Sequence, residues 1–73
     1  MRNRIEEIRK SRGITQEEFA RQMQVSRQTI SSLERGRYNP SIFLAHKIAC
    51  AFGMHIEDVF IFEEENGGTR DEG

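Results

Sequence analysis

Helix start and stop signals recur at short intervals along this chain and leave room for little except short helices joined by tight turns. Thr15 and Glu18 form a capping box, in which each side chain can bond the backbone N–H of the other residue. Ser26 stands where a helix begins, whereas Gly36 and Gly53 stand where helices end. These signals predict five helices, over about residues 3–11, 16–23, 27–35, 41–52 and 55–60.

Apolar residues follow the helical period within these segments. A chain of 73 residues can form one small core, so we expect a single all-α domain over residues 1–65 and a disordered acidic tail over residues 66–73. One proline and no tryptophan favour a compact helical domain over a β-sandwich. The expected core positions are Ile5, Ile8, Phe19, Ala20, Met23, Ile30, Leu33, Leu44, Ala45, Ile48, Ala49, Phe52, Ile56, Val59 and Phe60.

Several classes of protein are disfavoured by the composition. No apolar run approaches the roughly 18 residues that span a membrane, and the charged opening MRNRIEEIRK is unlike a signal peptide. The single cysteine cannot form an internal disulfide, which predicts a reducing, cytoplasmic location. The sequence has no catalytic His/Asp/Ser set, no carboxylate pair in an apolar setting and no Gly-rich phosphate loop. We therefore expect neither an enzyme nor a bound cofactor.

His46, Cys50 and His55 raise two alternatives, a metal site and, for Cys50, a redox switch. His46 and Cys50 are four residues apart and share a helix face, as zinc ligands often do. No clear fourth ligand accompanies them, so we expect no metal. Cys50 is better explained as a filler at the edge of the core, and His55 as the first residue of the short fifth helix.

Charge is distributed unevenly along the chain. Residues 1–56 carry ten Lys or Arg and five Asp or Glu, a net charge of +5, whereas residues 57–73 carry one Arg and seven Asp or Glu, a net charge of −6. A basic body with an acidic tail is common in domains that bind an anionic partner. An accidental distribution of solvated charges explains the asymmetry equally well on its own.

The third predicted helix has two chemically distinct faces. Ile30 and Leu33 point one way when the helix is drawn at about 100° per residue. The opposite face carries hydrogen-bond donors and no acid, and such side chains read base edges, since Arg pairs with guanine, Gln with adenine and Ser with either. Its residues are Arg27, Gln28, Ser31, Ser32 and Arg35.

Only the short turn around Gln24 and Val25 separates the second and third helices, which predicts a helix-turn-helix. The stretch TQEEFARQMQVSRQTISSLERGRYNPS resembles the DNA-binding segment of the Cro and phage-repressor family of regulators (the xenobiotic response element type), and the resemblance covers about residues 3–62. It implies a five-helix, lambda-repressor-like fold. The matching motif comprises Thr15-Gln16, Ala20, Val25, Ser26-Arg27-Gln28, Ile30-Ser31, Glu34, Gly36 and Asn39-Pro40-Ser41.

The resemblance also implies roles for individual residues. Gln16 would hold a phosphate and brace Gln28, and Glu34 would form a structural ion pair with Arg9. Base contacts would come from the start of the third helix, and the loop after it would contact the phosphates of the DNA backbone. The expected DNA-binding set is Gln16, Ser26, Arg27, Gln28, Ser31, Ser32, Arg35, Arg37, Tyr38 and Asn39, although Tyr38 could equally pack under the loop.

One residue departs from the family pattern, and one segment is less settled than the rest. Gln24 occupies a turn position where the family often has glycine, and a left-handed conformation there costs a non-glycine residue on the order of 1 kcal/mol. The run Val59–Phe62 is β-branched or aromatic throughout and could form a short C-terminal β-strand. That strand would pair with the N-terminus of its own chain or with its copy in a dimer, and we favour a homodimer interface at Phe60, Ile61 and Phe62.

These observations predict a sequence-specific transcriptional regulator, most simply a repressor that binds a near-palindromic operator in double-stranded DNA as a homodimer. It would reside in the cytoplasm, on the nucleoid. A protein-interaction module is the competing possibility, in which the acidic tail binds a basic partner, as in an antitoxin or an adaptor.

Overall fold

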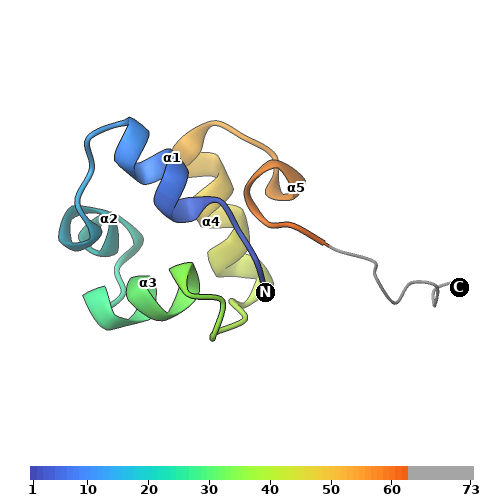
Figure 1. Ribbon diagram of the computed structural model, residues 1–73, viewed down its shortest axis with the longest axis horizontal. Coiled ribbons are helices and arrows are strands. Elements are labelled where there is room, and N and C mark those ends of the chain that lie inside the picture. Colours follow the sequence, from blue (N-terminus) through green and yellow to red (C-terminus); the bar gives the residue numbers. More distant parts are fainter. Residues whose placement is uncertain (63–73) are drawn as a thin grey trace, which may run out of the picture.

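Residues 1–62, which the computed structural model describes, fold into five helices (Figure 1). The helices are α1 (Ile5–Ser11), α2 (Gln16–Met23), α3 (Arg27–Glu34), α4 (Ile42–Phe52) and α5 (Ile56–Val59). Figure 1 shows α4 running through the middle of the fold, with α2 and α3 on one side and α5 on the other. The expected all-α, five-helix fold is confirmed. No helix of the described part is long and apolar enough to cross a membrane.

The predicted caps form as expected. Thr15 and Glu18 make both hydrogen bonds of the capping box, and the Ser26 hydroxyl accepts from the backbone N–H of Thr29 at 3.1 Å. Ser41 caps α4 in the same way, by accepting from Leu44 at 3.1 Å. Each cap supplies an acceptor for an N–H group that has no partner within its helix, so the starts of α2, α3 and α4 could be placed from local sequence alone.

The apolar faces of all five helices meet in one core. Ile5, Ile30 and Leu33 are fully buried, while the rings of Phe19 and Phe52 stack with their centroids 5.0 Å apart. Of the expected core positions, Leu44 and Ile56 are partly buried at its edge, and the other thirteen are buried: Ile5, Ile8, Phe19, Ala20, Met23, Ile30, Leu33, Ala45, Ile48, Ala49, Phe52, Val59 and Phe60.

The turn between α2 and α3 has the left-handed backbone conformation that the sequence suggested at Gln24. Gln24 has φ of 62°, and its backbone N–H helps to cap the C-terminal end of α2. Lys47 of α4 reinforces this turn, because its ammonium group donates to the carbonyl oxygen of Met23 at 3.1 Å. The residue at the turn is thus a strained glutamine where glycine would be relaxed.

The possible C-terminal strand does not form in the part of the chain that the structure describes. Val59 ends α5, and Phe60 makes only one isolated antiparallel bridge, to Asn3. Hydrogen bonds from Arg4 to Val59 (2.8 Å) and from Ile61 to Arg2 (2.9 Å) flank it. The N-terminal segment enters α1 at Ile5, so its extended part is too short for more pairing. Helix α1 begins at Ile5 rather than near Asn3, which is instead paired with Phe60. The expected tail at 66–73 lies outside the described residues.

Candidate nucleic-acid interface

Helix α3 is anchored on one side and open on the other. Ile30 and Leu33 are fully buried, so the helix cannot rotate about its axis without exposing them. Arg27 and Gln28, at its start, are exposed to solvent, and Ser31 and Ser32 are half-buried. Burial therefore selects which face of α3 points outward, and that face is the one with the polar side chains.

The outward side chains of α3 have hydrogen-bonding capacity that the protein does not use. Among residues 1–62, no hydrogen bond or ion pair engages the side chains of five of the predicted DNA-binding residues. Two of them are guanidinium groups, each with five N–H donors that need acceptors from outside. The five residues are Arg27, Gln28, Ser31, Ser32 and Arg35.

The Ser26 hydroxyl, by contrast, already has hydrogen-bond partners. Its hydroxyl accepts from the Thr29 N–H and lies 3.0 Å from the Thr29 hydroxyl. Because Ser26 occupies the N-cap, the backbone N–H groups of Arg27 and Gln28 that follow have no acceptor within the described chain. Such free N–H groups at the start of a helix favour an anion such as a phosphate.

The loop after α3 presents further polar groups beside this face. Arg37, Tyr38 and Asn39 are all exposed, Tyr38 at 43%. Tyr38 also lines a hollow beside Val25 and Leu44, so its ring is only partly covered. Asn39 accepts a hydrogen bond from the Met1 amino group at 3.4 Å. Arg37, two residues after Arg35, is a third cation that no ion pair engages in residues 1–62.

A buried cluster of polar side chains fixes α3 against the first two helices. The guanidinium of Arg9 on α1 donates to both carboxylate oxygens of Glu34, at 2.7 and 3.2 Å, and their side chains are only 7% and 4% exposed. Arg9 also donates to the carbonyl of Ile14 at 2.8 Å. The hydrogen bond to Glu34 raises the pKa of Arg9 above its ordinary value, against the opposing effect of burial. The ion pair expected from the family resemblance is therefore present.

Gln16 belongs to the same polar cluster. Its side-chain amide donates to Glu34 at 3.0 Å, so in this structure Gln16 braces Glu34 rather than Gln28, the partner expected for it. The reason is geometric, because the carboxylate lies between α1 and α2 and offers a charged acceptor to both. Whether Gln16 also contacts a phosphate stays a prediction.

Asn3 was not singled out by its sequence context, although it touches α3. Its amide nitrogen donates to the carbonyl of Leu33 at 2.7 Å, and its amide oxygen accepts from the N–H of Ile5 at 3.0 Å. Asn3 thus satisfies groups at the end of α3 and at the start of α1. Thirty residues separate Asn3 from Leu33, and no local pattern encodes such a contact.

The residues expected at a dimer interface are in three different environments. Phe60 is 1% exposed and belongs to the core of its own chain, Ile61 is half-buried, and Phe62 is 54% exposed. Of the three, only Phe62 presents a large surface to a partner. The dimer role of this segment stays a prediction.

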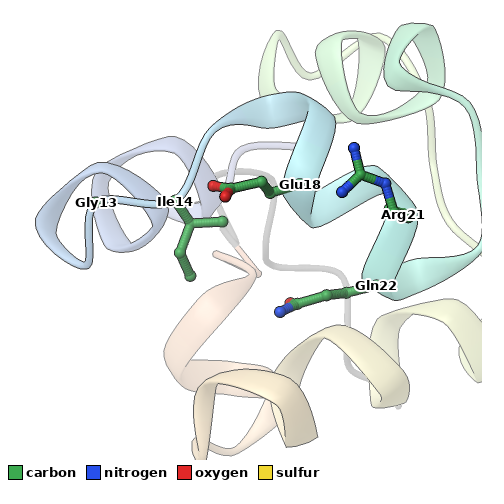
Figure 2. Close-up of a pocket in the computed structure, with 5 residues that line it drawn as sticks. All are labelled: Gly13, Ile14, Glu18, Arg21 and Gln22. Carbon is green, nitrogen blue, oxygen red and sulfur yellow. The ribbon is translucent and has the colours of Figure 1, made fainter.

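Two other sites offer no chemistry of their own. A hollow of about 400 Å³ lies between the α1–α2 turn and α2, lined by Ile14, Glu18 and Gln22 among others. Figure 2 shows Glu18 extending from α2 toward Ile14, and its carboxylate is held by the capping box. His46 and Cys50 lie 3.4 Å apart on α4, but no group of three potential metal ligands occurs in the described residues.

Comparisons with known proteins agree with this geometry. A helix-turn-helix family model matches residues 5–59. An HTH-type transcriptional regulator of Methanothermobacter thermautotrophicus is 58% identical over 66 residues, which cover 89% of this chain and 96% of that protein. The immunity repressor of Bacillus phage phi105 is 37% identical over 85% of this chain and 46% of its own length.

Solved structures are similar as well. The clp gene regulator ClgR from Corynebacterium glutamicum superposes with a TM-score of 0.68 at 33% identity, and a hypothetical transcription factor from Neisseria with a TM-score of 0.67 at 33% identity. Each match covers 74% of this chain, but only 57% and 61% of the two solved chains, less than two thirds of either.

Proposed function

This chain belongs to the helix-turn-helix family of DNA-binding transcriptional regulators, and we propose that it is a repressor that binds a near-palindromic operator as a homodimer. The observation that carries the proposal is the outward face of α3, where Arg27 and Gln28 are exposed and lack partners among residues 1–62. In a helix-turn-helix, the start of the second helix contacts the base edges in the major groove.

The predicted contacts divide into two groups with different consequences. Arg27, Gln28 and Ser32, with Ser31 beside them, lie on α3 and would read base edges, which gives sequence preference. Gln16 of α2, Arg35 and the loop residues after it would contact phosphates, which fixes the register of the protein on DNA without reading sequence. The predicted phosphate contacts are Gln16, Arg35, Arg37, Tyr38 and Asn39.

The small size of this reading surface supports a homodimer. Helix α3 has eight residues, and its first turn can reach only a few base pairs. Two copies related by a two-fold axis would place two α3 helices in successive major grooves, about 34 Å apart, and double the contacts. The two-fold symmetry of such a dimer makes the operator near-palindromic.

Repression is supported by one relative. The phage phi105 protein is an immunity repressor by name, and it is similar to 85% of this chain. A dimer bound across a promoter would exclude other proteins from the same DNA, which is the simplest mechanism of repression. In a reporter carrying the selected site across a promoter, expression should fall when this protein is produced. A rise would make the protein an activator.

The DNA-binding test uses a matched pair of double variants. After selection of bound sequences from random duplex DNA, Arg27→Ala with Gln28→Ala is compared in mobility shifts with Arg21→Ala with Gln22→Ala. Both variants remove an exposed Arg-Gln pair, but the second pair lies on α2 beside the hollow of Figure 2. Each lost bidentate base contact is worth about 1–3 kcal/mol, so the α3 variant should bind at least about tenfold more weakly. Equal binding by the two variants would refute the reading role of α3.

A further inference from the structure

Asn3 connects the N-terminal segment to the end of the helix that carries the proposed reading residues. Its side-chain amide nitrogen donates to the carbonyl oxygen of Leu33 at 2.7 Å, and its amide oxygen accepts from the N–H of Ile5 at 3.0 Å. Asn3 is half-buried, which strengthens these bonds relative to bonds in open water. One short side chain therefore links the last turn of α3 to the start of α1.

The turn that ends α3 lies against the same N-terminal segment (Figure 1). Gly36, in this turn, has a φ of 75°, and a Cβ atom there would lie 3.3 Å from the carbonyl oxygen of Met1. The Leu33 carbonyl, to which Asn3 donates, also accepts the N–H of Gly36 at 2.9 Å. Asn3 and the turn at Gly36 thus share one acceptor, and the backbone of the N-terminal segment covers the turn.

The N-terminal segment is itself fixed on its other edge. The N–H of Arg4 donates to the carbonyl oxygen of Val59 at 2.8 Å. The N–H of Ile61 donates to the carbonyl oxygen of Arg2 at 2.9 Å. Because these two bonds hold the backbone on both sides of Asn3, its side chain can keep the end of α3 in place rather than move with it.

The loop that follows this turn has few hydrogen bonds of its own. Residues 37–41 connect α3 to α4 and include three of the exposed residues proposed to contact phosphates. In residues 1–62, the backbone N–H groups of Tyr38 and Asn39 donate no hydrogen bond. The N–H of Arg37 donates to the carbonyl of Ser32, in α3, at 3.0 Å. A loop with so few bonds takes its position from its ends, and its first end is the turn that Asn3 holds.

We propose that Asn3 is a positioning residue for DNA binding, which places residues 37–39 by fixing the turn from which they start. The inference rests on the proposed function, because that function assigns phosphate contacts to these residues. A binding group must be held within about 0.5 Å of its productive position. A loop that is loose before binding must be ordered when DNA binds, and this ordering weakens affinity. Asn3 acts through the loop and makes no contact with DNA itself.

Asn3→Ser is the test variant, and Ser11→Ala is its matched control. A hydroxyl at position 3 can still accept from the N–H of Ile5, but it is too short to reach Leu33. The Ser11 hydroxyl donates to the carbonyl of Ile8 at 2.8 Å, so its removal deletes a bond of the same kind that does not involve α3. Each variant loses one side-chain hydrogen bond, so both should stay folded, and urea unfolding would check this.

Mobility shifts then measure how large the loss is and in which background it disappears. Asn3→Ser should bind the selected duplex and random duplex about five- to tenfold more weakly than wild type, because phosphate contacts read no sequence. The Ser11→Ala control should bind like wild type. In a protein that already carries Arg37→Ala and Tyr38→Ala, the further loss from Asn3→Ser should shrink to about twofold or less, whereas Gln28→Ala should leave the full loss. Wild-type binding by Asn3→Ser, or an undiminished loss without the loop side chains, would overturn the inference.

The DNA-free protein separates this inference from the proposed function. NMR relaxation should show the amides of Tyr38 and Asn39 more mobile in Asn3→Ser than in wild type, and unchanged in Ser11→Ala. A loop that keeps its wild-type mobility in Asn3→Ser would overturn the inference even if DNA binding falls. A loosened loop in a protein that binds no DNA would instead support the placement of the loop by Asn3 and reject the proposed function.

Discussion

Replacing Glu34 by alanine should destabilise the protein more than almost any other single change in a polar residue. The carboxylate of Glu34 accepts three hydrogen bonds, two from Arg9 and one from Gln16, at distances of 2.7 to 3.2 Å. With Glu34 removed, the Arg9 guanidinium stays in a site where its side chain is 7% exposed. Its charge then has no counter-ion there.

The magnitude follows from that stranded charge. Removing one partner of a buried ion pair typically costs about 3–5 kcal/mol. A chain of 73 residues has a total stability of roughly 4–11 kcal/mol, so the variant would lose a large part of it. Since about 1 kcal/mol shifts the Tm of a domain this small by about 4–8 °C, the Tm should fall by at least about 12 °C.

A double variant separates the stranded charge from the lost contacts. Arg9→Met with Glu34→Leu removes both charges and fills the space with apolar atoms, a replacement that is often nearly neutral. Arg9 also donates to the Ile14 carbonyl, so a cost of about 1 kcal/mol should remain from that lost bond. The double variant should therefore be more stable than Glu34→Ala alone.

Urea unfolding followed by far-ultraviolet circular dichroism measures the free energy of unfolding of each variant by linear extrapolation. Should Glu34→Ala prove too unstable for a folded baseline, Glu34→Gln provides a milder change in the same direction. The reasoning fails if Glu34→Ala loses less than about 1 kcal/mol, or if the double variant is as unstable as the single one.

Three further predictions concern the turn, the loop and the surface of α1. Gln24→Gly should raise the free energy of unfolding by about 1 kcal/mol, because it relieves the strain of the left-handed backbone at Gln24. Gln22→Gly, inside α2, is the control and should lower the free energy of unfolding by a similar amount. An equal effect of the two changes in urea unfolding would contradict this. Arg37→Ala should reduce the slope of log K for DNA binding against log salt by about 0.9, and an unchanged slope would remove Arg37 from the phosphate contacts. The hydrogen bond and charge of Lys10 lower the pKa of Glu6, so the pair stabilises the fold above about pH 4.5 and its effect disappears as the pH falls through the lowered pKa. Lys10→Met should raise the pKa of Glu6 toward its ordinary value in an NMR titration, and no change would disprove the pairing.

Local signals were enough to predict most of the fold. Thr15 and Ser26 cap helices because each hydroxyl accepts from an N–H three residues away, and such a bond depends on nothing outside its own turn. The burial of Ile30 and Leu33 followed from the helical period in the same way. The polar face of α3 then had to point outward, so the helical period also identified the candidate reading residues.

Contacts between distant residues could not be predicted from such signals. The Asn3–Leu33 hydrogen bond spans thirty residues, and the pairing of Arg9 with Glu34 was expected only because of a family resemblance. Gln16 bonds Glu34 instead of Gln28, since three helices converge on one carboxylate. The possible strand near Phe60 is reduced, in the described residues, to one bridge with Asn3 of its own chain, because the N-terminal segment that it meets enters α1 at Ile5.

The sequence by itself determined the five helices, the strained turn at Gln24 and the amphipathic division of α3, because each depends on interactions within a few residues of the chain. Tertiary structure alone decided how α3 is braced by Arg9, and that Ile42 and Phe62 line one groove although they are distant in the sequence. The physical reason is that burial of the apolar faces fixes how the helices pack, and packing brings together side chains that no local pattern relates.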